Sequence, residues 1–343
     1  MNASTRLPHV AVVVPCYNYG RFLVSCIESI VGQTGVETSV HVIDDASPDG
    51  SFGIALELAA RYRNVRATRN LVNLGHIATY NKGLAQVDSD YVVLLSADDQ
   101  LAPGALARAA ALMEAHPKVG LVYGHPQTFS GTPKETSYPL LHWSLWSGRN
   151  WTRAQFRRGL SIIYSPEAVV RTELQHQVGY YRADLPHSGD LEMWLRLAAH
   201  ADVGRVNGPD QAYRRLHPLS MMNSEFAGVL TDLRERQRAY EACLESESLS
   251  ARERGRLEAT MRRRLSMEAL GWAVDASRAG TEDSHAISEA VDFGREVYPE
   301  YLRLDAWKEF AAGTQLGLIE HLGRSRRELG DRLRWQRWRR FGV

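Results

Sequence analysis

From His9 to Tyr123 the sequence alternates between two kinds of segment, and this alternation constrains the fold more than any other feature. Apolar, β-branched runs that are typical of buried strands are each followed by a segment whose apolar residues recur at helical spacing. The run that starts at His9 is almost entirely apolar and stops at Pro15, as expected of a strand covered on both faces. The expected strands span His9–Val14, Ser39–Ile43, Val65–Thr68, Tyr91–Leu95 and Val119–Tyr123, and the helices between them span Tyr19–Gln33, Ser51–Tyr62, Ile77–Gln86 and Pro103–Ala115.

This order of elements predicts an α/β fold with a doubly wound, mostly parallel sheet, because strand–helix–strand units within one sheet connect by right-handed crossovers. Between Gly124 and Ser165 the pattern becomes aromatic and is expected to be rich in loops. A helix at Leu191–Ala199 and strands near Val203 and at Ala212–Leu216 are expected after that.

Strand signals stop near Met221, and leucine, alanine, arginine and glutamate dominate from there to the end. These residues favour helices. We therefore predict two parts, a sheet domain over residues 1–220 and an appended helical C-terminal region over residues 221–343.

Composition disfavours several classes of protein. A net charge of +1 gives the molecule as a whole no affinity for polyanions, and no stretch reaches the ~20 apolar residues of a membrane-spanning helix. Three cysteines without metal-ligand spacing indicate neither a disulfide framework nor a zinc site. Because Met1 to His9 lacks the apolar core of a secretory signal, the cytoplasm is the expected compartment.

The end of the chain is more basic than the rest. From Arg324 to Arg340 it carries eight arginines against two acids, with Trp335, Trp338 and Phe341 close by. Arginines interleaved with aromatic residues can hold a protein at an anionic membrane surface, and a solvated terminal helix has the same composition. Both interpretations stay open. Nucleic-acid binding is disfavoured, since no recognised module accompanies the basic tail.

Two of the expected strands end in a pair of acids. Asp44 and Asp45 follow the second strand, and Asp98 and Asp99 follow the fourth. The carboxyl ends of parallel strands meet at one edge of a sheet, where open α/β folds bind ligands. Four carboxylates there are unfavourable unless a cation neutralises them or hydrogen bonds stabilise them. The pairs predict Mn²⁺ or Mg²⁺ with a phosphorylated ligand; the alternative is that each pair caps the turn that follows it.

Two common phosphate-binding motifs are missing from the sequence. There is no Gly-x-x-x-x-Gly-Lys-Ser/Thr loop, and no Gly-x-Gly-x-x-Gly stretch follows the first strand, which runs instead into Pro15-Cys16-Tyr17-Asn18. A diphosphate at this edge would therefore depend on a metal and on nearby cationic or histidine side chains.

A series of motifs occurs in a characteristic order along the first 220 residues. They are Val-Pro-Cys-Tyr-Asn at 14–18, Ile-Asp-Asp-Ala-Ser-Pro-Asp at 43–49, Asn73-Leu74-Gly75 with Asn81-Lys82-Gly83, Ser-Ala-Asp-Asp at 96–99, His-Ser-Gly-Asp-Leu-Glu-Met-Trp at 187–194 and Tyr-Arg-Arg-Leu-His-Pro-Leu-Ser at 213–220. Together they resemble the family 2 glycosyltransferases, inverting enzymes of the GT-A fold. The resemblance implies that residues 1–220 bind a nucleotide sugar, typically a UDP-sugar, and catalyse transfer of its sugar to an acceptor.

The resemblance also implies roles for single residues. Asp45 would accept a hydrogen bond from the base, Asp98 would contact the ribose, and Asp99 would hold the Mn²⁺ or Mg²⁺ that bridges the diphosphate. His217 and Ser220 would lie near the metal or the phosphates, while His217 taken alone is equally a plain loop histidine. The residues implied to bind the nucleotide sugar are Pro15, Tyr17, Asn18, Asp45, Asn73, Gly75, Lys82 and Asp98, with Asp99 and His217 at the metal.

One departure from the family concerns the cation that answers the phosphates or the base. Relatives often carry an arginine just before the asparagine at 81, and this sequence has Tyr80. Lys82 and Arg69 are the candidates that remain.

An inverting transfer needs a carboxylate that removes the acceptor's proton on the face opposite the departing diphosphate. Asp190 matches the family's base and stands at the start of an expected helix, whose dipole favours an ionised carboxylate and would be stabilised by it even without chemistry. Glu192 is the rival, and at about 200° around the helix it cannot share a face with Asp190. Relatives commonly place an acid directly before this aspartate, where the chain has Gly189.

The stretch from Tyr138 to Trp151 is unusually aromatic for a loop. Trp143, Trp146 and Trp151 would line an acceptor groove in one interpretation, and would cover the sheet edge and join the core in the other. The acceptor (a glycan, a lipid-linked glycan or a small molecule) is not identified. An acceptor-positioning or dimerising role for the helical region is a hypothesis.

Two other functions are kept as alternatives. A sugar-phosphate nucleotidyltransferase also places acids on an α/β sheet, but it would usually begin with a glycine-rich basic loop where this chain has Pro15 to Arg21. The second alternative is a nucleotide-sugar-binding protein on a catalytically degenerate scaffold, which the presence of all the matching acids disfavours.

Overall fold

The structure, a computed structural model, describes residues 6–134, 138–217, 228–247, 249–278, 284–311 and 333. These residues form two compact units. The first contains the described residues up to Trp151 and from Ile162 to His217, and the second contains Thr152–Ser161 with the described residues after 227. The segment Thr152–Ser161, which the predicted boundary at 220 assigns to the sheet domain, thus groups with the later helices. The division of function between residues 1–220 and 221–343 stays a prediction.

The first unit alternates strands and helices along most of its length. In chain order its elements are β1 (His9–Cys16), α1 (Gly20–Val31), β2 (Glu37–Asp44), α2 (Ser51–Arg61), β3 (Val65–Arg69), α3 (His76–Leu84), β4 (Tyr91–Leu94), β5 (Gln100–Leu101), α4 (Ala105–Ala115), β6 (Val119–Phe129), β7 (His142–Trp146), the beginning of α5 (Gly148–Arg158), η1 (Ser165–Glu167), β8 (Val169–Arg171), α6 (Thr172–Val178), α7 (Gly189–Ala198) and β9 (Asp202–Arg215).

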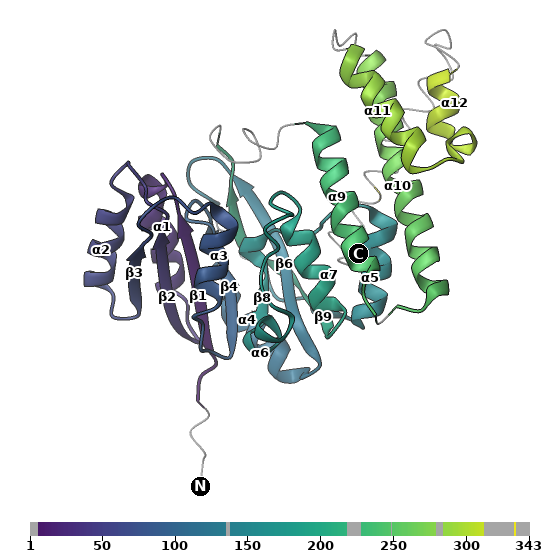
Figure 1. Ribbon diagram of the computed structural model, residues 1–343. Coiled ribbons are helices and arrows are strands. Elements are labelled where there is room, and N and C mark those ends of the chain that lie inside the picture. Colours follow the sequence, from purple (N-terminus) through teal and green to yellow (C-terminus); the bar gives the residue numbers. More distant parts are fainter. Residues whose placement is uncertain are drawn as a thin grey trace. The chain divides into compact units, whose positions relative to one another are not determined.

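The strands form a single nine-stranded sheet in the order β3-β2-β1-β4-β8-β6-β9-β5, with β7 pairing to β9. Of the described strands, β1, β2, β3, β4, β6 and β9 run in one direction, and the short strands β5, β7 and β8 run against them. Figure 1 shows β3, β2, β1 and β4 side by side. The predicted α/β fold with a doubly wound, mostly parallel sheet is confirmed.

The inner strand β1 shows why the sheet is covered on both faces. Val12 belongs to a core cluster with residues of α1, α2 and α4 on one side. The next residue, Val13, points the other way and meets Gly83 of α3. Both valines are fully buried, as the continuous apolar run predicts.

The prediction of a loop-rich stretch between Gly124 and Ser165 is wrong in part. β6 continues to Phe129, and β7 and α5 lie within the stretch. β7 is an edge strand in which no residue is fully buried, so it lacks the apolar run that predicts an inner strand. The two strands expected near Val203 and at Ala212–Leu216 are one long strand, β9, whose middle holds the buried polar residue Asn207.

The second unit is helical where it is described. It contains the later residues of α5, α9 (Val229–Leu244), α10 (Ala251–Arg278), α11 (Ser284–Val297), η2 (Tyr301–Arg303) and α12 (Asp305–Ala311). α10 and α11 share a core that includes Leu270 and Val291. The predicted helical C-terminal region is therefore confirmed over these residues, whereas the arginine-rich tail from Arg324 to Arg340 lies outside them. No helix among the described residues is long and apolar enough to cross a bilayer.

Replacement of Gly83 by alanine is expected to destabilise the first unit by roughly 1–3 kcal/mol, because a methyl group there would overlap Val13 and lie 2.8 Å from the Ile43 side chain. Gly53→Ala is the matched control, since an added methyl on that exposed helical residue meets nothing within 4 Å. That control should gain about 0.5–1 kcal/mol from helix propensity. Urea unfolding of both variants measures the difference, and equal effects would contradict close packing of α3 on β1.

Candidate active site

The loops that follow β1, β2, β3 and β4 lie at the same edge of the sheet because these strands are parallel and adjacent. Pro15 is paired with Ile43 across β1 and β2, and Tyr17 beyond it is 44% exposed. Asn18 takes a left-handed conformation with φ of 59°, and its N–H donates to Oγ of Ser47 at 3.0 Å. The sequence-predicted residues after β1 thus stand at the edge where a ligand would bind.

The Asp45 carboxylate holds the loop that follows β3. It is 3% exposed and accepts hydrogen bonds from the side chain of Asn70 (2.7 Å) and from the backbone N–H groups of Leu74 (2.9 Å) and Gly75 (3.0 Å). Asn73 accepts a further bond from the N–H of Gly75, which itself has φ of 84°. Asp45, Asn73 and Gly75 therefore form one loop-holding unit. A contact between Asp45 and a base stays a prediction, and it would use the remaining acceptor capacity of this carboxylate.

The two cations predicted for the phosphates are bonded to other groups. Lys82 donates to Oδ1 of Asn70 at 2.6 Å, which ties it to the Asp45 network. Arg69 pairs with the buried Asp44 at 3.1 Å and donates to the carbonyl of Ser47 at 2.9 Å. Arg69 therefore neutralises one of the four edge carboxylates, and Lys82 reinforces the loop.

The second acidic pair is buried against the end of β9. Asp98 and Asp99 are 8% and 6% exposed. The Arg215 backbone N–H donates to Oδ1 of Asp99 at 2.8 Å, and the Arg215 guanidinium donates to the Asp98 carbonyl at 2.9 Å. Nε2 of His217 lies 3.0 Å from Oδ2 of Asp98. The structure therefore brings Asp98, Asp99 and His217 together, while Ser220 lies outside the described residues.

The described protein stabilises the ionised form of Asp99 only in part. Burial and the neighbouring Asp98 raise the pKa of Asp99 well above its usual range. Carboxylate oxygens suit Mn²⁺ or Mg²⁺, so Asp98 and Asp99 fit such an ion chemically, and the His217 imidazole lies beside them. Among the described residues no three side chains are arranged as a ready-made metal site. An ion here would need further oxygen ligands from a bound phosphate.

Asp190 stands in the first turn of α7 and is partly exposed. Oδ1 of Asp190 accepts a hydrogen bond from the Tyr181 hydroxyl at 2.9 Å. Burial raises the pKa of Asp190, whereas this hydrogen bond and the charges of His76 and Arg214 act to lower it. The Tyr80 hydroxyl is influenced by both Asp190 and Asp98, which raise its pKa together with burial. A Cβ added to the preceding Gly189 would lie 3.8 Å from the Ile77 side chain at the start of α3, so the candidate base lies beside the loop that follows β3.

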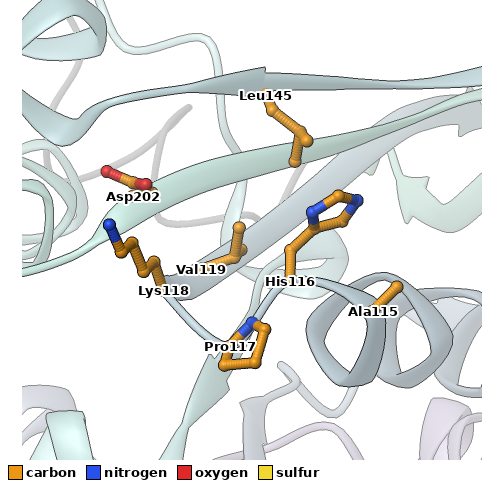
Figure 2. A pocket seen from close by; sticks show the side chains of 7 residues that line it. All are labelled: Ala115, His116, Pro117, Lys118, Val119, Leu145 and Asp202. Carbon is orange, nitrogen blue, oxygen red and sulfur yellow. The ribbon is translucent and has the colours of Figure 1, made fainter.

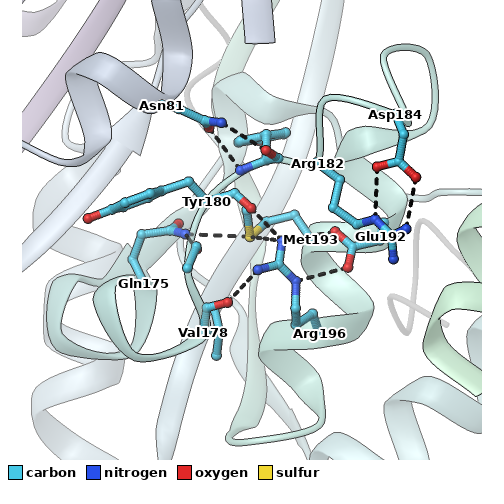
Figure 3. Close-up of polar contacts among 11 residues, drawn as sticks. Asn81, Gln175, Val178, Tyr180, Arg182, Asp184, Glu192, Met193 and Arg196 are labelled. Atoms are coloured by element: carbon cyan, nitrogen blue, oxygen red, sulfur yellow. Dashed lines mark hydrogen bonds and ion pairs between the residues drawn. The ribbon is translucent and has the colours of Figure 1, made fainter. Parts of the chain in front are cut away.

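Glu192 points into the protein and is 5% exposed. Both of its carboxylate oxygens accept bonds of 2.9 Å from the Arg196 guanidinium. Arg196 donates in turn to the carbonyls of Val178 and Tyr180, the second at 2.7 Å (Figure 3). This bidentate pair supports the turn before α7 and leaves Glu192 poorly placed to act as a base.

Besides Arg215, sequence reasoning missed three further residues near this edge. Arg214 acts electrostatically on Asp99 and on Asp190, and its guanidinium lies 4.5 Å from the centre of the Tyr164 ring. Tyr181 binds Asp190, and the Asn81 side chain binds the backbone of Tyr181. A signal for Arg214 existed in its position three residues before His217, whereas nothing in the sequence paired Tyr181 with Asn81.

The aromatic segment covers the sheet. Trp143 is partly buried against the main core, and Trp146 stacks on the buried Tyr123 with ring centres 6.5 Å apart. Trp151 is 1% exposed. β7 pairs with residues 203–207 of β9, which precede by several positions the stretch at Arg215 that meets the acids. These contacts favour the packing interpretation over an acceptor groove.

A hollow of about 280 Å³ lies at the opposite edge of the sheet, where β6 and β9 begin. His116, Lys118, Leu145 and Asp202 are among its lining residues (Figure 2). None of the predicted site residues lines it, so it is separate from the acidic edge.

Comparison with known proteins indicates similarity to glycosyltransferases. Residues 11–171 match the model of the family described as glycosyl transferase family 2. An uncharacterized protein of Mycobacterium tuberculosis is 28% identical over 249 residues, which cover 67% of this chain and 74% of that protein. The uncharacterized glycosyltransferase YibD of Escherichia coli is 33% identical over 103 residues, 30% of this chain and 29% of that protein.

Solved structures agree with the fold. TarS of S. aureus, in complex with UDP-GlcNAc, has a TM-score of 0.59 at 18% identity over 86% of this chain and 92% of that one. The mannosyltransferase PcManGT of Pyrobaculum calidifontis, in complex with GDP-Man and Mn²⁺, has a TM-score of 0.58 at 16% identity over 98% and 84%. The fold is thus that of the GT-A glycosyltransferases. Residues 11–171 of the chain thus form a glycosyl transferase family 2 domain.

Asp99→Asn is expected to raise the thermal midpoint of the metal-free and nucleotide-free protein by a few degrees at neutral pH, because it removes a buried charge beside Asp98 and keeps an acceptor for Arg215. Folding raises the pKa of Asp99, so its protonated form is the favoured one. The cost of its charge is absent at low pH and grows as pH rises above the ordinary carboxyl range. Thermal unfolding at pH 4 and pH 7.5 should show the advantage of the variant only at the higher pH; a lower midpoint at pH 7.5 would contradict this account.

Proposed function

We propose that this glycosyltransferase is inverting and metal-dependent, and that it moves a sugar from a nucleoside diphosphate, a UDP-sugar in the first place, to an acceptor. The observation that carries the proposal is that one edge of the sheet holds a buried acidic pair, Asp98 and Asp99, and that a separate, partly exposed carboxylate, Asp190, lies beside the start of α3. The acidic pair suits a metal ion that also binds a diphosphate, and Asp190 suits removal of a proton.

The donor would lie along the loops that follow β1 to β4. Pro15, Tyr17 and Asn18 would flank the nucleotide, with Asp45, Asn73 and Gly75 shaping the wall beside the base and Asp98 near the ribose. Lys82 would act by holding Asn70 and the loop rather than by touching phosphate. TarS and PcManGT, which have the same fold, are seen with UDP-GlcNAc and with GDP-Man, and this supports a nucleotide-sugar donor without choosing the base.

Asp99 and His217 would hold the Mn²⁺ or Mg²⁺. When bound, such an ion supplies positive charge to the leaving diphosphate. Asp190 would take the acceptor proton as the acceptor oxygen attacks the anomeric carbon from the face opposite the diphosphate, which inverts that carbon. Arg214, whose charge acts on both Asp99 and Asp190, is a further cation for the region between them.

The acceptor, a homodimer and peripheral membrane contact of the basic tail belong to this proposal as open parts. The tail lies outside the described residues, and the proposed acceptor is a glycan, a lipid-linked glycan or a small molecule. Of the two alternatives, a nucleotidyltransferase would bind a nucleoside triphosphate with a sugar phosphate, and a degenerate binding protein would bind the donor without turnover.

Asp190→Asn should bind nucleotide as the wild type does and lose at least 100-fold in turnover, because the amide cannot take a proton. Turnover is measured as release of nucleoside diphosphate from the donor, with water or an added acceptor as nucleophile. Glu192→Gln is the control: it weakens the pair with Arg196 and should lower the thermal midpoint more than Asp190→Asn does, with turnover reduced far less. An active Asp190→Asn variant would place the base elsewhere, and a wild type without any turnover would support the binding-protein alternative.

Thermal-shift screening with UDP, UDP-GlcNAc, GDP and GDP-mannose, each with and without Mn²⁺, tests the donor and the metal together. We expect uridine nucleotides to stabilise the protein only when Mn²⁺ is present, by about 2.7 kcal/mol at a ligand concentration 100 times Kd. In Asp99→Asn the metal-dependent part of the shift should disappear. Equal stabilisation with and without Mn²⁺ would exclude the metal from donor binding, and a larger shift with GDP would change the assigned base.

A further inference from the structure

Tyr181 connects the candidate base to the donor half of the sheet domain. It lies between α6 and α7, is 5% exposed, and donates its hydroxyl to Oδ1 of Asp190 at 2.9 Å. Its backbone is fixed from α3, a hundred residues earlier in the chain. The Asn81 side chain accepts from the Tyr181 N–H at 2.9 Å and donates to the Tyr181 carbonyl at 2.8 Å. Both the hydroxyl end and the backbone of Tyr181 are therefore held.

The ring of Tyr181 is fixed as well. It meets the Tyr80 ring with centres 5.7 Å apart and planes at 77°. On another side it lies against the first residue of α7, since a Cβ added to Gly189 would come within 3.1 Å of a Tyr181 ring carbon. A side chain at position 189 would therefore press on the ring. The absence of an acid before Asp190 is physically consistent with a tyrosine that occupies this space.

Four groups interact electrostatically or by a hydrogen bond with the Asp190 carboxylate. His76 and Tyr80 come from α3, Arg214 comes from β9, and Tyr181 comes from the connection before α7. Tyr181 is the one among these for which the described structure records a direct hydrogen bond to Asp190. Burial and the adjacent Asp190 raise the pKa of Tyr181 well above its usual value. Its hydroxyl therefore stays protonated and remains a donor wherever Asp190 is ionised.

We propose that Tyr181 is a positioning residue for the transfer: its hydroxyl holds Oδ1 of Asp190 and so directs Oδ2 toward the acceptor, while the Asn81 clamp keeps Tyr181 in place. The inference rests on the proposed function, because it deepens the role of Asp190. In the reaction the acceptor O–H proton passes to Oδ2 as the bond from the acceptor oxygen to the anomeric carbon forms. The bond from that carbon to the phosphate oxygen breaks, and its electron pair leaves with the diphosphate. Tyr181 keeps its proton throughout.

Tyr181→Phe tests the proposal by deleting only the hydroxyl. A hydrogen bond to an ionised group favours that ionised form, so its loss should raise the pKa of Asp190, by roughly one unit for a bond of ordinary strength. The pKa is measured by ¹³C NMR titration of carboxyl-labelled aspartate, with the Asp190 signal assigned by its loss in Asp190→Asn. This measurement needs neither donor nor acceptor.

The neighbouring residue provides a matched control. The Tyr180 hydroxyl bonds to Nδ1 of His176 at 2.8 Å, not to Asp190. Tyr180→Phe deletes the same atom one position away and should leave the pKa of Asp190 unchanged. In turnover, measured with the nucleotide sugar that the thermal-shift screen selects, Tyr181→Phe should lower kcat about tenfold at neutral pH. The acidic limb of its pH profile should move to higher pH while the donor KM stays the same. Tyr180→Phe should match the wild type.

An unchanged Asp190 pKa and a wild-type pH profile in Tyr181→Phe would overturn the inference. If Asp190→Asn were inactive at the same time, the proposed role of Asp190 as base would still stand; if Asp190→Asn were active, the base of the proposed reaction would lie elsewhere. Should Tyr181→Phe fold poorly, Asn81→Ala serves in its place, because it releases the Tyr181 backbone and keeps the hydroxyl. A folded Asn81→Ala protein should show a smaller upward shift of the Asp190 pKa, and no shift would contradict the clamp.

Discussion

The buried carboxylate pair Asp98–Asp99 is the constraint around which the edge of the sheet is built. Two like charges removed from water are costly unless polar groups answer them. Here the answer comes from the end of β9, more than a hundred residues later in the chain, through Arg215 and His217. The register of β5 on β9 delivers them: Gln100 pairs with Tyr213, so antiparallel pairing carries Arg215 to the position opposite Asp98. A two-residue strand therefore aligns the acids with their partners.

Arg215 is itself held by aromatic rings. Its guanidinium lies 4.5 Å from the ring centre of Phe22 on α1 and 4.4 Å from that of Phe129 at the end of β6. The His217 ring contacts Tyr19 and Phe22. The cation that supports the acidic pair thus depends on the packing of α1 and β6, and the electrostatics of the edge depend on the core beneath it.

The parts of the fold that could be predicted are those whose sequence shows a regular pattern of apolar residues. β1 to β4 and the helices between them follow from apolar runs and helical spacing, because they are buried on regular faces. The sequence pattern predicts two strands in place of β9 because Arg205, Asn207 and Asp210 are polar residues in its buried middle. Two of them have partners on other strands: Asn207 donates to Ser144 at 2.9 Å, and Asp210 lies 3.2 Å from His125. A pattern of apolar residues cannot predict a buried polar residue whose hydrogen-bond partner lies on another strand.

The candidate site divides in the same way. The acids could be predicted because parallel strands place their ends together, a rule that needs no side-chain detail. The cations could not, because Lys82 and Arg69 are close to the motifs in sequence but bond to Asn70 and to Asp44. The cations that act on the acids, Arg214 and Arg215, belong to β9, more than a hundred residues later in the chain.

The two departures from the family pattern, Tyr80 and Gly189, acquire a common explanation in the structure. Tyr80 fills the position of a frequent arginine and packs on Tyr181, and Gly189 leaves the room that the Tyr181 ring occupies. Among the described residues, the direct hydrogen-bond partner of Asp190 is thereby a neutral hydroxyl and not a fixed counter-ion. A full ion pair would hold a carboxylate firmly but would lower its affinity for a proton. A phenol that stays protonated orients the carboxylate at less cost to its basicity, and this suits a residue whose task is to accept a proton.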